Sequence, residues 1–287
     1  MSNVSCEDLY REDSLKKLLR RFDIRVNSDR GQHFLLEKSL LELIARKAGP
    51  AEIGLEIGAG PGSLTCLLKK RFERIYAIEI DGGFQSLFTE LNPEKSVEFV
   101  QADFLNLDFT ELGLEKDRSA VLVGNIPYHI TGKIFERAVE SRDYFSRAVF
   151  TTQKEVADRI LAEPGTRECG AITYYIRAYA EVSHLADLPP NLFYPPPEVD
   201  SSIIEIVFEP EKKFESDDRT FHSVVQGLFN YRRKTIRKGL IVSPKFSLTR
   251  EEVDEMLALT GIDPRNRPED LTIADFDRLT RAIMERI

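Results

Sequence analysis

The sequence has 287 residues and lacks most features of membrane, secreted or metal-binding proteins. No stretch approaches the roughly 18 consecutive apolar residues that cross a bilayer, so no membrane association is expected. The N-terminus, MSNVSCEDLYREDS, has no apolar segment after a basic one, which argues against a secretory signal. Only three cysteines occur (Cys6, Cys66 and Cys169), isolated and without metal-site spacing. These absences favour a reducing, cytoplasmic location and no bound metal.

Basic residues are outnumbered, with 40 Lys and Arg against 48 Asp and Glu and a net charge of −8. Taken alone, this balance argues against a nucleic-acid partner. Residues 76–118, however, hold ten acidic and three basic residues and so account for −7 of that charge. Basic residues gather in 11–30 and 230–240, where a run indicates either a solvated helix face or a phosphate-binding patch. The candidate phosphate-binding residues are Arg20, Arg21, Arg25, Arg232, Arg233, Lys234, Arg237 and Lys238.

The order of apolar patterns predicts an arm and two domains. Residues 1–30 are expected to form a polar, partly helical N-terminal arm. Over 31–210, strand-like segments alternate with helical ones such as 37–47 and 63–72, the latter with Ser63 as N-cap. This alternation predicts an α/β fold with a mostly parallel, doubly wound sheet. Segment 170–188 reads as β-rich, the proline-rich segment 188–200 as an exposed loop, and 211–287 as a small helical domain.

A glycine-rich turn follows the first predicted strand of this domain. Its spacing, Gly58-x-Gly60-x-Gly62, is one residue shorter than the dinucleotide fingerprint, which weighs against an NAD-dependent enzyme. Glu79 ends the next strand, 21 residues after Gly58, where an acid can accept hydrogen bonds from both ribose hydroxyls of an adenosine. Asp103 ends the third strand and is placed to meet an adenine amino group. An acidic pocket suits a sulfonium cation, so the three features together favour S-adenosylmethionine over a purely structural turn.

Asn125, Ile126, Pro127 and Tyr128 follow the fourth predicted strand. The exocyclic nitrogen of a base is a poor nucleophile because its lone pair is delocalised into the ring. The Asn125 side-chain carbonyl and the Ile126 main-chain carbonyl are suitable acceptors for its protons, and Tyr128 can stack on the base. Phe193 could close the opposite face. A plain Asn-x-Pro turn and a core role for Phe193 are the alternatives.

Several segments resemble the KsgA-type rRNA adenine dimethyltransferases in order and approximate spacing, over about residues 20–285. They are Gly31-Gln32-His33-Phe34-Leu35, EIGAGPGSLT, AIEID, QADFL, GNIPYHIT, TTQKEVADRI, NLFYPPPEVDSSI, FNYRRKTIRKGL and RNRPEDLTIADFDRL. The chain departs from the usual family pattern at His33, where an Asn is usual, and at His129, Thr151 and Thr152.

The resemblance implies a class I S-adenosylmethionine-dependent methyltransferase fold, a Rossmann-like doubly wound sheet with a small C-terminal helical domain. It implies dimethylation of two adjacent adenines in small-subunit (16S) rRNA within an assembling 30S particle, by a monomer. By position, the cofactor residues would be His33, Leu35, Gly58, Glu79, Asp103 and Asn125. A resistance-type large-subunit rRNA methyltransferase and a non-catalytic RNA-binding assembly factor are the alternatives.

Overall fold

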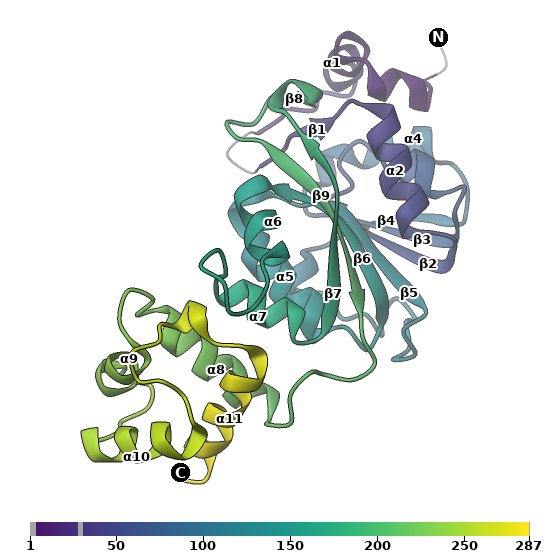
Figure 1. Cartoon of the computed structure of the whole chain (residues 1–287). Coiled ribbons are helices and arrows are strands. Elements are labelled where there is room, and N and C mark those ends of the chain that lie inside the picture. Colours follow the sequence, from purple (N-terminus) through teal and green to yellow (C-terminus); the bar gives the residue numbers. More distant parts are fainter. Residues whose placement is uncertain (1–3, 28–30, 287) are drawn as a thin grey trace. The chain divides into compact units, whose positions relative to one another are not determined.

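The computed structural model describes residues 4–27 and 31–286, which fall into two compact units (Figure 1). The first unit comprises Met1–Ala157 and Val182–Phe208, and the second Asp158–Glu181 and Glu209–Ile287. The sequence predicts a boundary near residue 210 and places 158–181 before it. The structure instead groups 158–181 with the C-terminal helices.

A seven-stranded sheet forms the centre of the first unit, in the order β4-β3-β2-β5-β6-β9-β7. The β4-β3-β2-β5-β6 pairs are parallel, and β9 runs antiparallel to β6. Its strands are β2 (Ala51–Ile57), β3 (Phe72–Glu79), β4 (Val97–Gln101), β5 (Ala120–Asn125), β6 (Phe145–Gln153), β7 (Ala180–Leu188) and β9 (Ser201–Phe208). The short strands β1 (Phe34–Leu35) and β8 (Phe193–Tyr194) pair separately. The mostly parallel, doubly wound sheet predicted from the sequence is confirmed.

Helices on both faces of the sheet bury its apolar side chains, which explains the near-continuous apolar runs in β5 and β6. The predicted helix over 37–47 is α2 (Lys38–Ala48), whose Leu41, Ile44 and Ala45 are buried in the core. The other helices of the unit are α3 (Thr65–Leu68), η3 (Gly82–Phe84), α4 (Gln85–Leu91), η4 (Phe104–Asn106), η5 (Tyr128–Ile130), α5 (Thr131–Glu140) and η6 (Pro190–Leu192). Helix α6 (Lys154–Leu161) begins in this unit.

The helix predicted over 63–72 is much shorter in the structure. Helix α3 spans only Thr65–Leu68, and its N-cap residue is Leu64. The Ser63 hydroxyl is buried and makes no hydrogen bond within the described residues, so its predicted capping role is wrong. Strand β3 already begins at Phe72, because its pairing with β2 extends to Ala51. Sheet pairing therefore overrides the helical propensity of this segment.

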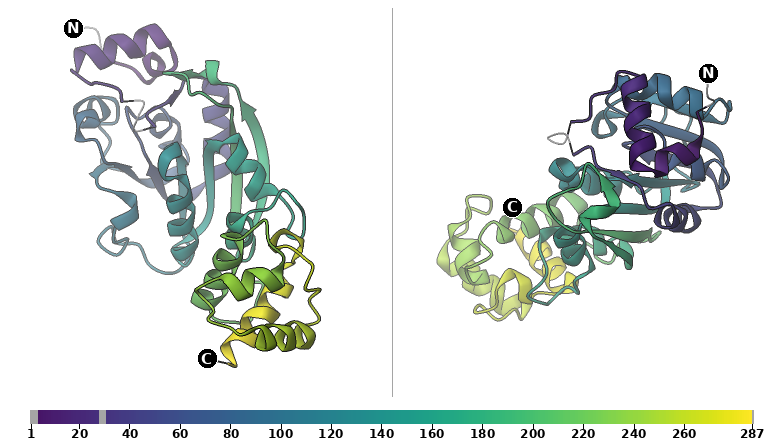
Figure 2. Two further views of the ribbon diagram at one scale, coloured as in Figure 1. Left: turned by 90° about the vertical axis from the view of Figure 1, so that its left-hand side faces the viewer. Right: turned by 90° about the horizontal axis from the view of Figure 1, so that it is seen from above.

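The N-terminal arm contains the 3₁₀ helix η1 (Cys6–Tyr10) and helix α1 (Glu12–Arg21), both in the first unit (purple in Figure 2). The apolar face of α1 is buried there through Leu15, Leu18 and Leu19. The prediction that all three cysteines are isolated is wrong, because Cys6 and Cys66 form a disulfide 60 residues apart in sequence. Cys169 is free and buried. Because Cys6 and Cys66 are so far apart in sequence, their spacing gave no indication that they are in contact in the folded chain.

The second unit is helical, with α8 (Asp218–Phe229), α9 (Ile236–Val242), α10 (Arg250–Thr260), η7 (Pro268–Asp270) and α11 (Ile273–Met284). It also contains α7 (Ala171–Arg177), although the sequence reads as β-rich there. Tyr174 explains the difference, since its ring packs 4.7 Å from Phe276 and 5.5 Å from Phe229, centroid to centroid. Tertiary burial thus decides the conformation of an aromatic segment. No helix among the described residues is long and apolar enough to cross a membrane.

Candidate functional site

A cavity of about 520 Å³ opens at the carboxyl ends of β2, β3 and β5, within the range of small-ligand sites. Parallel α/β sheets bind ligands at this edge. The structure brings six of the predicted site residues to its wall: His33, Gly58, Glu79, Asp103, Asn125 and Pro127.

The glycine turn and Glu79 form one side of the cavity. Gly58 and Gly60 have φ of +70° and +52°, which favour glycine, and a Cβ on Gly60 would lie 3.0 Å from the Phe34 ring. The Glu79 carboxylate accepts hydrogen bonds from the Gly60 and Asp81 N–H groups, both at 2.9 Å. Burial raises the pKa of Glu79, and the backbone hydrogen bonds partly oppose this shift. Glu79 therefore connects two strand ends and presents an acidic group to the cavity.

Asp103 lines the same cavity as Glu79, as predicted from the ends of successive strands. It caps η4, where Oδ1 accepts a hydrogen bond from Leu105 N at 3.0 Å and Oδ2 one from Asn106 Nδ2 at 2.8 Å. These bonds hold the carboxylate in one orientation. Ile80, which directly follows Glu79 in the sequence, also lines the cavity and is 63% exposed. Sequence reasoning missed Ile80, although a large apolar residue directly after an acid at a strand end is a usable signal.

Asn125 ends β5 with one half of its amide engaged. Its Nδ2 donates to the His33 carbonyl oxygen at 2.5 Å. Its Oδ1 is buried and has no hydrogen-bond partner among the residues that the structure describes. A buried acceptor without a partner costs about 1–3 kcal/mol. The Ser63 and Thr151 hydroxyls are also without partners among the described residues, so Asn125 stands out because it also lines the cavity. Asn125 thus lines the cavity with one half of its amide held and the other half without a partner among the described residues.

Tyr128 does not line the cavity. Its ring stacks on the His33 imidazole, with centroids 5.6 Å apart and an interplanar angle of 25°. Its hydroxyl forms a hydrogen bond with the buried Ser201. The His33 Nδ1 lies 2.8 Å from the Pro195 carbonyl oxygen, so a neutral imidazole donates from Nδ1 and keeps Nε2 as an acceptor. In this conformation the His33 imidazole lies over one face of the Tyr128 ring.

The remaining predicted residues lie behind the cavity wall. Leu35 and Phe193 face each other in the β1–β8 pair and are buried in the core, at 2% and 3% exposed. Phe193 therefore acts as a core aromatic here rather than as a surface that closes over a base. Ile126 is buried, and its N–H donates to the Thr151 carbonyl oxygen at 2.9 Å. The spacing of residues in the sequence could not distinguish these residues, which lie behind the cavity wall, from the residues that line it.

Beneath the glycine turn lies Glu56, a buried acid that sequence reasoning did not single out. It is 2% exposed and accepts a hydrogen bond from Thr65 Oγ1. Burial, together with the nearby Glu79, raises its pKa to about 8. Glu56 is thus protonated in the folded chain at pH values where the unfolded chain ionises it.

This shift predicts a pH-dependent stability. Between about pH 5 and 8 the folded chain holds a proton on Glu56 that the unfolded chain has lost. The contribution of Glu56 to the free energy of unfolding therefore falls as pH rises. Glutamine does not titrate, so the free energy of unfolding of Glu56→Gln should rise relative to that of the natural chain. The difference should grow by about 1.4 kcal/mol for each pH unit across that window. Urea unfolding at several pH values measures the difference. Glu52→Gln is the control, exposed on the same strand, and an equal pH profile for both variants would contradict the prediction.

The predicted basic residues separate into paired and exposed groups. Arg232 donates to Glu269 at 3.0 Å, and Arg237 forms two hydrogen bonds to Asp254, at 2.6 and 2.8 Å. These two arginines are therefore held by acids. The exposed members are Arg20, Arg21, Arg25, Arg233, Lys234 and Lys238, of which Arg21 lies 3.2 Å from Glu90. No cluster of three or more potential metal ligands occurs among the described residues.

Comparisons with known proteins identify the family of this chain. The family model described as Ribosomal RNA adenine dimethylase matches residues 24–285. A relative named Ribosomal RNA small subunit methyltransferase A, from Clostridium botulinum, is 34% identical over 94% of this chain and 98% of its own length. One of the same name from Anaeromyxobacter dehalogenans is 36% identical over 95% and 99%.

Solved structures add similarity of fold. A dimethyladenosine transferase from Plasmodium falciparum has a TM-score of 0.70 and 22% identity, over 86% of this chain and 96% of its own. The 23S rRNA methyltransferase ErmE has a TM-score of 0.64 and 25% identity, over 87% and 99%. The expected Rossmann-like methyltransferase fold is thereby confirmed. From the family match across almost the whole chain, we conclude that this protein belongs to the ribosomal RNA adenine dimethylase family.

Proposed function

We propose that this protein dimethylates the exocyclic amino groups of two adjacent adenines in small-subunit (16S) rRNA, with S-adenosylmethionine as methyl donor. Family membership and the names of the most similar relatives support the reaction class. The observation that carries the assignment to this site is the buried, unpartnered Oδ1 of Asn125 among the described residues. An rRNA substrate in an assembling 30S particle implies a cytoplasmic enzyme, and we propose that it acts as a monomer.

Asn125 supplies what an adenine amino group requires. An acceptor aimed at an N–H proton draws the nitrogen lone pair out of conjugation and toward the methyl donor. Because Nδ2 is held by the His33 carbonyl, the amide cannot rotate freely, and Oδ1 stays oriented. The Ile126 carbonyl beside Pro127 is the second proposed acceptor. For Tyr128 to stack on the base, its ring must first reach the cavity, which it does not line in this structure.

The chain's residues also fit S-adenosylmethionine, whose sulfonium centre supplies an activated methyl group. The positive-φ glycines leave room for a ligand beside the backbone, and Glu79 and Asp103 offer acceptors for hydroxyl and amino groups. Both acids also suit a positively charged ligand. We assign Gly58, Glu79 and Asp103 to the adenosine half and place His33 and Asn125 nearer the reacting end.

Glu79 tests the cofactor assignment. In Glu79→Gln, the side-chain NH₂ group would face the N–H of Gly60 or Asp81, so one of two hydrogen bonds is lost. Affinity for S-adenosylmethionine should fall about 10- to 100-fold, as expected for a hydrogen bond to a charged group. Calorimetric titration measures it. The control is Glu98→Gln, an exposed acid on neighbouring β4, and equal affinities in the two variants would refute the assignment.

For RNA contact we propose the exposed basic residues of each unit, chiefly Arg233, Lys234 and Lys238, with Arg20, Arg21 and Arg25 in the arm. Exposed lysines and arginines can pair with phosphates, which dominate RNA affinity. Arg21, Arg232 and Arg237 each have an acidic partner that a phosphate would have to displace.

The substrate is tested with a radiolabelled methyl donor and immature small and large ribosomal subunits. Labelled dimethyladenine in the small subunit alone, located by nucleotide-level mapping, is the expected result. Since the fold also resembles ErmE, incorporation into the large subunit alone would replace our proposal with the large-subunit alternative. Cofactor binding without methylation of either subunit would favour a non-catalytic assembly factor.

A further inference from the structure

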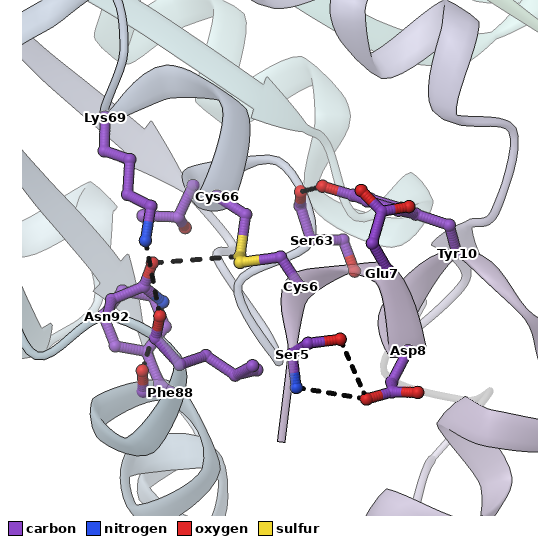
Figure 3. Close-up of a disulfide and its surroundings, with 12 residues drawn as sticks. Ser5, Cys6, Glu7, Asp8, Tyr10, Ser63, Cys66, Lys69, Phe88 and Asn92 are labelled. Atoms are coloured by element: carbon purple, nitrogen blue, oxygen red, sulfur yellow. Dashed lines mark hydrogen bonds between the residues drawn. A yellow bond between two sulfur atoms is a disulfide. The ribbon is translucent and has the colours of Figure 1, made fainter. Parts of the chain in front are cut away.

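The N-terminal arm has a covalent connection to the cofactor side of the first unit. Helices η1 and α1 precede residue 24, where the family model begins to match. The disulfide between Cys6 and Cys66 nevertheless joins this arm to α3, with the two Cα atoms 6.1 Å apart (Figure 3). The arm is thus attached to the family's core fold by a bond that thiol chemistry can break.

Cys66, to which the arm is bonded, follows closely after the glycine turn in the sequence. Cys66 N donates to the Gly62 carbonyl oxygen at 3.0 Å, so Cys66 belongs to the turn that leaves the glycine segment. Asn92 lies next to both, because its side chain is against the disulfide in Figure 3 and a Cβ on Gly62 would be 3.0 Å from its Nδ2. The arm makes a second contact here, where the Tyr10 hydroxyl donates to the Ser63 carbonyl oxygen at 3.1 Å. Two bonds therefore connect the arm to residues 62–66.

Packing extends this connection to the cavity wall. The buried leucines of the arm share one apolar cluster with Phe34, Phe84 and Cys66. Phe34 and Phe84 both line the cavity, and Phe34 also contacts Gly60. The arm therefore packs against two residues that line the cavity, and one of these, Phe34, lies against Gly60 of the glycine turn.

Besides the disulfide, η1 is held by Leu9, which is fully buried, and by the hydrogen bond from Tyr10 to Ser63. Helix η1 is a five-residue 3₁₀ helix near the chain's start, and its ion pair, Glu7 with Lys38 at 2.6 Å, is exposed. Exposed pairs contribute at most about 1 kcal/mol. Cys6 is partly exposed whereas Cys66 is 3% exposed, so Cys6 is the more accessible half of the disulfide.

We propose that the Cys6–Cys66 disulfide is a redox-controlled tie, which orders the arm and the glycine-turn helix when oxidised and loosens both when reduced. Reduction takes two electrons from a dithiol. Its thiolate attacks Cys6 Sγ to form a mixed disulfide, Cys66 leaves as a thiolate and takes up a proton, and the second thiol then releases Cys6 as a thiol. The products are two cysteine thiols and one oxidised dithiol. The consequence for methylation, weaker cofactor binding by the reduced form, rests on the proposed function.

Hydrogen exchange on the full chain tests the tie without a cofactor. Oxidised protein and protein reduced with dithiothreitol are compared, with alkylation and mass spectrometry to verify each state. Reduction should speed amide exchange in residues 5–22 and 62–68, leaving the second unit unchanged. Affinity for S-adenosylhomocysteine, measured by calorimetry, should fall about 5-fold or more.

Two variants provide the controls. Cys6→Ser should match the reduced protein and no longer respond to dithiothreitol, and its partly exposed position spares the core. Cys169→Ala removes the free, buried cysteine and should keep the full response. Equal rates of amide exchange in both redox states would contradict the proposal that the disulfide orders the arm. An effect of dithiothreitol on these rates that persists in Cys6→Ser would contradict it as well. If neither form binds S-adenosylhomocysteine, the proposed cofactor is wrong, and the exchange data alone still decide the tie.

Discussion

Replacing Asn125 by alanine should lower kcat for adenine methylation by about 10²- to 10³-fold, the usual cost of removing one oriented hydrogen-bond group from a reaction centre. The reason is the position of its Oδ1, buried and without a partner among the described residues, while Nδ2 is held by the His33 carbonyl. Single-turnover methylation of immature small subunits measures the effect. Folding is verified by circular dichroism.

The pattern across variants separates catalysis from cofactor binding. We expect the affinity of Asn125→Ala for S-adenosylmethionine to change much less than kcat, because Glu79 and Asp103 keep their acceptors. Asn125→Asp retains an acceptor but loses the Nδ2 bond to His33, so it should be intermediate. Asn191→Ala, an exposed asparagine in η6, is the matched control and should methylate normally. An Asn125→Ala enzyme as fast as this control would eliminate the catalytic role.

Replacing Gly124 by alanine should destabilise the protein by about 3 kcal/mol, at the upper end of typical overpacking costs. A Cβ on Gly124 would lie 2.6 Å from the Ile57 carbonyl oxygen and 3.3 Å from the Ile126 side chain. Gly124 is directly paired with Ile57 between β5 and β2, in the middle of the sheet, so the backbone has little room to move. Urea unfolding at pH 7 measures the change.

Gly132→Ala is the matched control for Gly124→Ala. Gly132 lies in the first turn of α5, and apart from its chain neighbours and the backbone of its own helix no described residue has an atom within 4 Å of a Cβ placed there. Alanine is the better helix former, so this variant should be unchanged or more stable by up to about 1 kcal/mol. A Gly124→Ala protein within about 0.5 kcal/mol of this control, the scatter of surface substitutions, would show that β5 and β2 can separate.

The polar residues at the strand ends were predictable because local and global signals agree there. Each parallel strand carries its polar residues at its carboxyl end, so Gly58, Glu79, Asp103 and Asn125 had to meet at one edge once the strand order was known. The same reasoning does not identify the residues that lie behind the cavity wall. Leu35 and Phe193 belong to a pair of two-residue strands that no periodicity could reveal.

The parallel sheet, the acidic edge at its strand ends and the resemblance to the family were therefore predictable, since each depends on local periodicity or on motifs read in order. The contacts between distant residues became visible only in the folded structure. Folding paired Cys6 with Cys66, stacked His33 on Tyr128, turned the aromatic segment around Tyr174 into a helix, and neutralised Arg237 with Asp254. These outcomes depend on contacts between residues that are not neighbours in the chain, which local periodicity and propensity do not encode.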